Sequence, residues 1–270
     1  LGDVYKRQVL VLFAWSLLIV LQAQELVFQD KDGIVRWKKN NQEVALFGAN
    51  YCLPSSCDYR AAGYVNADRK AMVREDMDHF KRMGWDALRI CFWGDFQNSD
   101  PDGHLIDNDH LNMMDYLIAE ASRRGIYMLF SPIVTYDSQF PEMNDNSNTG
   151  YAKLFAKNTL IHDEKAIKCQ INYMTDILNH VNRYTGRCIK DEPNIIYVEI
   201  INEPTQFPND IPGMVKYINC MCKAIKSTGC KKLIYYNLSQ NFDVAPAIQK
   251  SMVDGATSVS YTHLTLPTIL

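Results

Sequence analysis

The sequence carries no large excess of charge of either sign and none of the common cofactor or nucleophile motifs. Its 28 basic and 31 acidic residues leave a formal net charge of −3, which gives no electrostatic support for a nucleic-acid or anionic-membrane partner. It contains no P-loop, no G-x-S-x-G and no Cys-x-x-Cys pair, and its histidines show no metal-ligand spacing. We therefore expect no metal and no cofactor, and a small-molecule or neutral polymeric substrate.

No apolar run is long enough to span a bilayer. The longest, residues 9–21, reads VLVLFAWSLLIVL, whereas a transmembrane helix needs about 20 apolar residues. This length suits the hydrophobic core of a signal peptide, with Ala23 as the cleavage point. We predict a signal peptide over residues 9–23, a secreted or periplasmic protein, and no membrane span in the mature chain. A buried helix or a lipid-facing anchor is the alternative.

The two ends of the chain share an unusual relationship. Residues 3–8 read DVYKRQ and residues 259–264 read VSYTHL, and the two hexapeptides can be encoded by opposite strands of one DNA element. That element resembles a transposase recognition end used in sequencing libraries. We interpret residues 1–8 and 258–270 as processing scars that do not belong to the folded domain.

Eight cysteines are present, which an exported protein could oxidise. Cys52 and Cys57 flank a short loop that contains Pro-Ser-Ser and that a disulfide between them could close. A second group of cysteines comprises Cys188, Cys220, Cys222 and Cys230. Pairing cannot be deduced from the sequence. Several cysteines lie on predicted apolar faces, so most are expected to be buried thiols.

The region after the signal segment alternates between strands and helices. A β-hairpin is expected over residues 26–48, followed by strands at 44–50, 87–92, 126–134, 195–201 and 232–237 and a sixth strand beginning at 255. Helix starts are indicated by Asn66, by Asn108 or Asp109, by Asp163 and by Pro212. Such alternation predicts parallel strands covered by helices.

Two α/β architectures fit this alternation. A doubly wound open sheet usually carries a glycine-rich first turn, and Gly48-Ala49-Asn50-Tyr51 is not one. We therefore predict a (β/α)8 TIM barrel over residues 24–257, incomplete, with about its first five and a half βα units. We expect one domain and a monomer.

Polar and aromatic residues stand at the ends of successive predicted strands. They are Asn50 and Tyr51, Arg89 and Trp93, Tyr136, Asn202 and Glu203, and Asn237. A closed barrel gathers such ends around one mouth. We predict that these residues bind or orient a substrate there, and that the aromatic ones stack on sugar rings.

Glu203 is the candidate catalytic residue. A carboxyl group that emerges half-desolvated at the mouth of a barrel is suited to general acid catalysis. Pro204 is expected to hold Glu203 in an extended backbone. The alternative is that Asn202-Glu203-Pro204 is only a strand-ending turn. Glu199 is interpreted as structural, either facing the helices or paired with Arg89 in a buried network.

Three segments resemble clan A glycoside hydrolases, and family 5 in particular, which includes cellulases and mannanases. IIYVEIINEP (195–204) resembles their fourth strand, WDALRICFWGDF (85–96) the second and GANY (48–51) the first. The resemblance implies that Glu203 is the acid/base, that Asn202 binds the hydroxyl beside the anomeric carbon, and that Arg89 keeps the nucleophile ionised.

The resemblance also implies a retaining β-glycosidase that hydrolyses a plant-type β-glycan, cellulose-like or mannan-like, by double displacement. The family's nucleophile is a Glu at the end of the seventh strand, whereas this chain reaches only the sixth, so we expect the chain itself to be inactive. Two alternatives remain open. One is a non-catalytic polysaccharide-binding barrel, and the other is an exo-acting relative of β-galactosidases or β-mannosidases.

Overall fold

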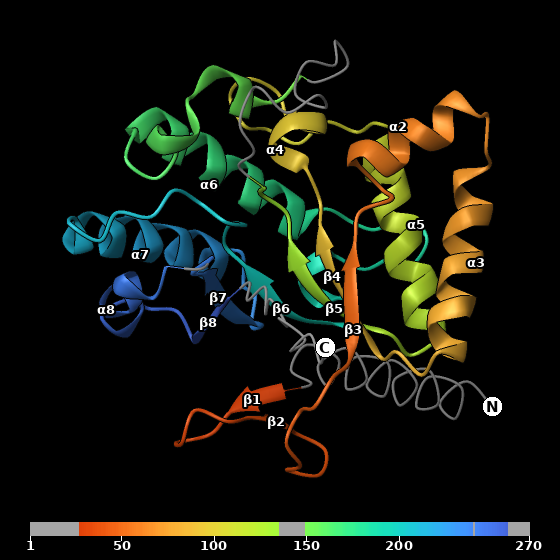
Figure 1. Ribbon diagram of the computed structural model, residues 1–270, viewed down its shortest axis with the longest axis horizontal. Coiled ribbons are helices and arrows are strands. Elements are labelled where there is room, and N and C mark those ends of the chain that lie inside the picture. The colour runs from red at the N-terminus through yellow and green to blue at the C-terminus, as the bar shows by residue number, and fades with distance from the viewer. Residues whose placement is uncertain (1–26, 135–148, 240, 259–270) are drawn as a thin grey trace, which may run out of the picture.

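The computed structural model describes residues 27–134, 149–239 and 241–258, except for the side chain of Cys57. Its centre is a six-stranded parallel sheet in the order β3-β4-β5-β6-β7-β8 (Figure 1). The strands are β3 (Gly48–Tyr51), β4 (Ala87–Cys91), β5 (Tyr127–Ser131), β6 (Ile195–Glu199), β7 (Leu233–Asn237) and β8 (Gly255–Thr257).

The strand order distinguishes the two architectures. Each strand pairs in parallel with the next one in the sequence, from β3 through β8. A doubly wound sheet reverses its strand order at a switch point, and no reversal occurs among these six strands. The prediction of a partial (β/α)8 barrel is confirmed, and the open-sheet alternative is wrong.

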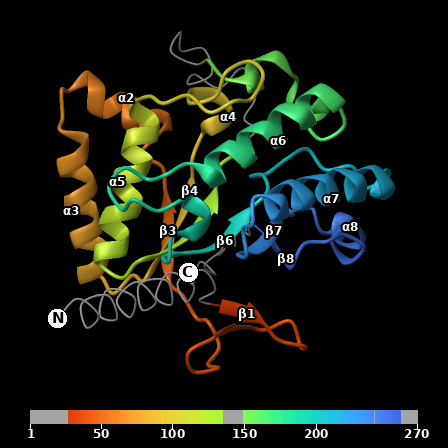
Figure 2. The same ribbon diagram turned by 180° about the vertical axis from the view of Figure 1, so that it is seen from behind.

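Most of the helices lie along the outer face of the sheet, as the two opposite views show (Figures 1 and 2). They are α3 (Arg69–Arg82), α5 (Asp109–Arg123), α6 (Glu164–Asn179), α7 (Ile211–Ser227) and the short α8 (Ala245–Gln249). The short α2 (Ser56–Tyr64) and α4 (Gly94–Gln97) lie near the carboxyl ends of the strands (Figure 1). Short 3₁₀ turns occupy Tyr151–Leu154, Lys157–Thr159, Ile189–Asp191 and Phe242–Val244. Within the described residues, no helix has the length and apolar character needed to cross a membrane.

Most of the expected helix starts are confirmed. The side chains of Asn108 and Asp163 accept backbone N–H bonds at the starts of α5 and α6. Pro212 lies in the first turn of α7. The prediction for Asn66 is wrong, because Asp68 caps α3 while Asn66 adopts a left-handed backbone with φ of 52°. An Asn in that conformation belongs to the preceding turn rather than to a helix start.

The N-terminal hairpin is confirmed and consists of β1 (Val27–Gln29) and β2 (Val35–Trp37), which pair antiparallel. The Asp30 carboxylate accepts the backbone N–H groups of Asp32 and Ile34 inside its turn. Gly33 has a φ of 81°, a conformation that costs glycine little. The hairpin lies beyond the amino ends of the sheet strands, opposite α4 (Figure 1).

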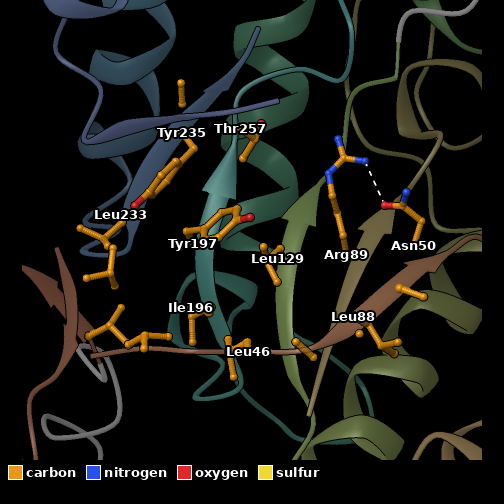
Figure 3. Close-up of a pocket in the computed structure, with 17 residues that line it drawn as sticks. Leu46, Asn50, Leu88, Arg89, Leu129, Ile196, Tyr197, Leu233, Tyr235 and Thr257 are labelled. Carbon is orange, nitrogen blue, oxygen red and sulfur yellow. Dashed lines mark hydrogen bonds between the residues drawn. The ribbon is translucent and has the colours of Figure 1, made fainter. Parts of the chain in front are cut away.

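The two faces of the sheet differ in burial. Leu88 and Ile90 on β4 and Ile234 on β7 are fully buried, as expected for side chains beneath the helices. The alternate positions, among them Arg89 and Tyr235, are less completely buried, and the Arg89 side chain is 16% exposed. They line a cavity of about 560 Å³ on the inner face of the sheet (Figure 3). The carboxyl end of this inner face holds the candidate site.

Candidate active site

Arg89 is the centre of the polar cluster on the inner face. It is the third residue of β4, where side chains alternate between the helices and the inner face. Its Nε and Nη2 donate to Glu199 Oε2 at 2.9 and 2.6 Å. Nη2 also donates to Asn202 Oδ1 at 2.7 Å, and Nη1 donates to Asn50 Oδ1 at 3.2 Å. One guanidinium therefore joins β3, β4 and the β6 end.

Glu199 is fully buried at the end of β6 and accepts hydrogen bonds at both carboxylate oxygens. Besides the two bonds from Arg89, Oε1 accepts from Asn237 Nδ2 at 2.7 Å and from Thr257 Oγ1 at 2.6 Å. An ionised carboxylate can accept at all of these positions. Of the two expectations for Glu199, the structure therefore supports the buried network with Arg89.

The ion pair also affects the titration of Arg89. Burial alone would lower the pKa of the guanidinium, but the Glu199 carboxylate beside it opposes this, and the net effect is a raised pKa. Arginine stays charged under all ordinary conditions. Arg89 therefore remains a charged hydrogen-bond donor at the carboxyl ends of the strands, with the Glu199 carboxylate as its countercharge.

Asn202 is held by both its backbone and its side chain. Its backbone N–H donates to Ile133 O at 2.8 Å, and its Nδ2 donates to Val134 O at 3.4 Å. These bonds fix the end of β6 against the segment that follows β5. Because Asn202 Oδ1 also accepts from Arg89, the orientation of the side-chain amide at the carboxyl ends of the strands is fixed.

Glu203 has a backbone that differs from the predicted one. Its φ is 41°, in the left-handed region, so the expectation that Pro204 holds it extended is wrong. Non-glycine residues adopt this conformation at a cost of about 1–3 kcal/mol, and such residues cluster at functional sites. Glu203 is half-buried. It directly follows Asn202, whose side chain accepts from Arg89, so its backbone continues from the Arg89 cluster.

Cys91 belongs to the site and was not predicted. Its Sγ lies 2.8 Å from Arg89 Nη1 and 3.9 Å from Asn202 Oδ1. Burial raises the pKa of the thiol to about 12, although the charge of Arg89 acts in the opposite direction. Cys91 is two residues after Arg89 on the same strand, so strand alternation is the signal that could have found it. Thr257 on β8, which donates to Glu199, was also not predicted, and strand alternation could have found it in the same way.

The predicted aromatic residues do not form a platform open to a ligand: Tyr51 points away from the cluster, and Trp93 is buried next to Cys91. The Tyr51 hydroxyl donates to Asp76 on α3 at 2.7 Å, and its ring packs edge-on against Phe80. Tyr51 therefore lies among the helices, because Asn50 before it takes the inward position. Trp93 is 3% exposed and packs against Phe96 at the start of α4, which leaves little indole surface open to a sugar. Tyr136 lies outside the described residues.

The turn into α4 depends on one glycine. A Cβ added at Gly94 would lie 1.6 Å from the hydroxyl of Tyr173 on α6. Only glycine fits at this contact, which positions the loop that carries Trp93. Among the described residues, no group of three or more His, Cys, Asp or Glu side chains is arranged to hold a metal ion.

The fold and the cluster define a β/α-barrel protein whose carboxylate and amide side chains gather at the carboxyl ends of its strands, where barrel enzymes place their active sites. The family model for cellulases of glycosyl hydrolase family 5 matches residues 37–246. The chain belongs to glycosyl hydrolase family 5.

The curated relatives are plant enzymes of mannan hydrolysis. The chain is 28% identical over 130 residues to mannan endo-1,4-beta-mannosidase 4 of Oryza sativa, an alignment that covers 45% of the chain and 27% of the relative. It is 28% identical over 164 residues to mannan endo-1,4-beta-mannosidase 3 of Arabidopsis thaliana, covering 57% and 38%. The matched regions thus span between a quarter and two fifths of the length of these relatives.

A solved structure supports the fold. The chain superimposes on a variant of a family 5 mannosidase from Rhizomucor miehei in complex with mannosyl-fructose, with a TM-score of 0.63 and 17% identity. The match covers 88% of this chain and 62% of the mannosidase chain. At this identity the likeness concerns the barrel fold.

Proposed function

We propose that this chain carries the acid/base half of a retaining β-glycosidase that acts on a mannan-like β-glycan. Glu203 protonates the leaving oxygen and then activates water, while Asn202 orients the neighbouring hydroxyl. The observation that carries the proposal is the position of Asn202 and Glu203. They follow the end of β6, the fourth strand of the parallel sheet, and Asn202 accepts from the Arg89 of the Arg89–Glu199 pair.

The second carboxylate of the mechanism has no assigned residue in this chain. Double displacement needs two carboxyl groups about 5–5.5 Å apart. Glu199 is fully buried and accepts from four donor atoms. Asp95 is fully buried within α4, where its carboxylate accepts from the Val134 backbone N–H. We propose that the nucleophile comes from a barrel strand beyond β8 and that the 270-residue chain alone has no turnover.

The test uses the complete gene product and its Glu203→Ala variant. We expect activity on mannan to fall by about 10²–10⁴-fold, with a smaller loss on activated aryl mannosides, because only poor leaving groups need protonation. Added azide should restore the second step on the aryl substrate. Glu75→Ala, an exposed glutamate of α3, is the matched control and should retain full activity.

Three outcomes would contradict the proposal. Loss on both substrates without azide rescue would remove the acid/base role from Glu203. If the complete gene product hydrolysed cellulose but not mannan, the proposed mannan-like substrate would be wrong and the substrate would be cellulose-like. Turnover by the purified 270-residue chain would show that one of its own acids, with Glu199 and Asp95 the first to examine, serves as nucleophile.

The same assay distinguishes internal from terminal cleavage. An endo-acting enzyme releases mixed oligosaccharides and rapidly lowers the viscosity of mannan, whereas an exo-acting mannosidase releases one small product from chain ends. We propose endo action because the two curated relatives described above are mannan endo-1,4-beta-mannosidases. Accumulation of a single small sugar without loss of viscosity would instead support the exo-acting alternative.

We also propose export, based on the apolar segment 9–21, which lies outside the described residues. The mature N-terminus should fall near Gln24. N-terminal sequencing of secreted protein checks this, and exported material that still contains residues 9–21 would favour a membrane anchor.

A further inference from the structure

Two cysteines lie opposite each other at the carboxyl ends of β3 and β4. The parallel register aligns Asn50 with Arg89 and Tyr51 with Ile90. One residue further along, Cys52 is therefore level with Cys91. Asn50 and Arg89 both reach the inner face and are hydrogen-bonded to each other there (Figure 3). Because side chains alternate along a strand, Cys52 and Cys91 share that same face.

The spacing of neighbouring strands suits a covalent bond between the two residues. Adjacent strands lie about 4.7–4.9 Å apart, and cysteines joined in a disulfide have Cα atoms about 4.4–6.8 Å apart. Cys91 forms a small apolar cluster with Trp93, Phe96, Val134 and Ala152, and Cys52 packs against this cluster. Both residues carry reduced thiols in the structure.

We propose that Cys52 and Cys91 are a redox modification site that forms a reversible disulfide across the β3–β4 pair. The oxidant is a low-molecular-weight disulfide such as glutathione disulfide. The thiolate of Cys52, which is the more exposed of the two, attacks one glutathione sulfur and releases one glutathione thiolate. Cys91 then gives up its proton to solvent and attacks the Cys52 sulfur, which releases the second thiolate. The protein loses two hydrogens, and the oxidant becomes two glutathione thiols.

Oxidation would reach the candidate active site directly. The Cys91 Sγ contacts Arg89 Nη1 and lies within hydrogen-bonding distance of Asn202 Oδ1. In the disulfide it has no proton to donate and is directed toward Cys52. The disulfide would also tie β3, an edge strand of the described sheet, to β4. We expect the oxidised protein to unfold on the order of 10 °C higher than the reduced protein, by loop-entropy arguments.

The test is a disulfide map of the complete protein after incubation with glutathione disulfide, alkylation and digestion with trypsin. Cleavage after Lys39, Arg60 and Arg89 places Cys52 and Cys57 together in peptide 40–60 and Cys91 in the next cysteine peptide. We expect peptide 40–60 joined to the Cys91 peptide, and released by dithiothreitol. Fragmentation at the Leu53–Pro54 bond then assigns the link to Cys52 rather than Cys57.

Matched variants separate the pair from its neighbours. Cys57→Ser should retain the link and the higher unfolding temperature on oxidation, whereas Cys52→Ser should lose both. An internal Cys52–Cys57 bridge, glutathione that remains on Cys52, or alkylation of both Cys52 and Cys91 would each overturn the proposal. The map of the unsubstituted protein gives this answer even if a variant fails to fold. No glycosidase activity is needed, so the result is independent of the proposed function.

Discussion

Arg89 and Glu199 form a buried ion pair that joins the second and fourth strands of the sheet, with Arg89 Nη2 lying 2.6 Å from Glu199 Oε2. The other Glu199 oxygen accepts from Asn237 on β7 and Thr257 on β8. One carboxylate thus links four of the six parallel strands at their carboxyl ends. The position of Asn202, and so of Glu203 after it, depends on this pair through Arg89.

Glu199→Gln should strongly destabilise the complete gene product. Glutamine keeps the size of the side chain but leaves the buried Arg89 guanidinium without a countercharge, and breaking a buried pair in this way typically costs about 3–5 kcal/mol. Urea unfolding followed by circular dichroism measures the change. The control is Glu164→Gln, whose carboxylate is 92% exposed and lies 4.0 Å from Lys216, and which should cost less than about 1 kcal/mol. Equal effects of the two substitutions would show that the buried pair adds nothing to stability.

Arg89→Lys should impair catalysis nearly as much as Arg89→Ala. The guanidinium reaches Glu199, Asn202 and Asn50 from three separate nitrogens, and the single ammonium of lysine cannot span them. Each lost charge-assisted bond is worth about 1.5–3 kcal/mol, so kcat/KM on mannan should fall on the order of 10²-fold.

The control for this substitution is Arg36→Lys. Arg36 lies on the hairpin strand β2 and pairs with Asp30, away from the cluster, so its replacement should leave kcat/KM unchanged. Near-normal activity of Arg89→Lys would mean that charge alone suffices and that the fork geometry of arginine has no catalytic role.

Lys232 should make stability increase with pH. It is buried just before β7, and its Nζ donates to the backbone carbonyls of Glu192 and Ile195 at 2.7 and 2.6 Å. Burial lowers its pKa from 10.5 to about 8. Between these values the unfolded chain binds more protons than the folded one, so the contribution of Lys232 to stability rises with pH. At 1.36 kcal/mol per pKa unit, the full change is ~3 kcal/mol.

Comparison with Lys232→Met isolates this effect. Buried thiols such as Cys91 and Cys222 have raised pKa values and act in the opposite direction above pH 8, but they are common to both proteins. The free energy of unfolding of the unsubstituted protein, minus that of Lys232→Met, should therefore increase between pH 8 and 10.5. A difference that stays flat across this range would show that Lys232 is charged in the folded state.

The grouping of the site residues could be predicted from the sequence, but the direction of some side chains could not. Parallel strands bring their carboxyl ends to one edge, so Asn50, Arg89, Asn202 and Asn237 were placed together correctly. Tyr51 was expected at the same mouth but points toward the helices. Side chains alternate between the two faces of a strand, and nothing in this four-residue strand indicates which of its residues face inward. The backbone of Glu203 was also missed, because tertiary bonds at the end of β6 override the local preference for an extended residue before proline.

Glu203→Gly should be more stable than Glu203→Ala, the reverse of the usual order. Alanine normally exceeds glycine by about 0.5–1 kcal/mol because glycine loses more entropy on folding. At a φ of 41°, however, a Cβ costs roughly 1–2 kcal/mol that glycine avoids. The net advantage of glycine should therefore be up to about 1.5 kcal/mol in urea unfolding. Both variants lack the carboxylate, so the difference between their free energies of unfolding reports only the backbone conformation at position 203.

A matched pair of substitutions at Glu75, inside helix α3, should show the ordinary preference for alanine. If alanine were also the more stable residue at position 203, Glu203 would not be held in a left-handed conformation.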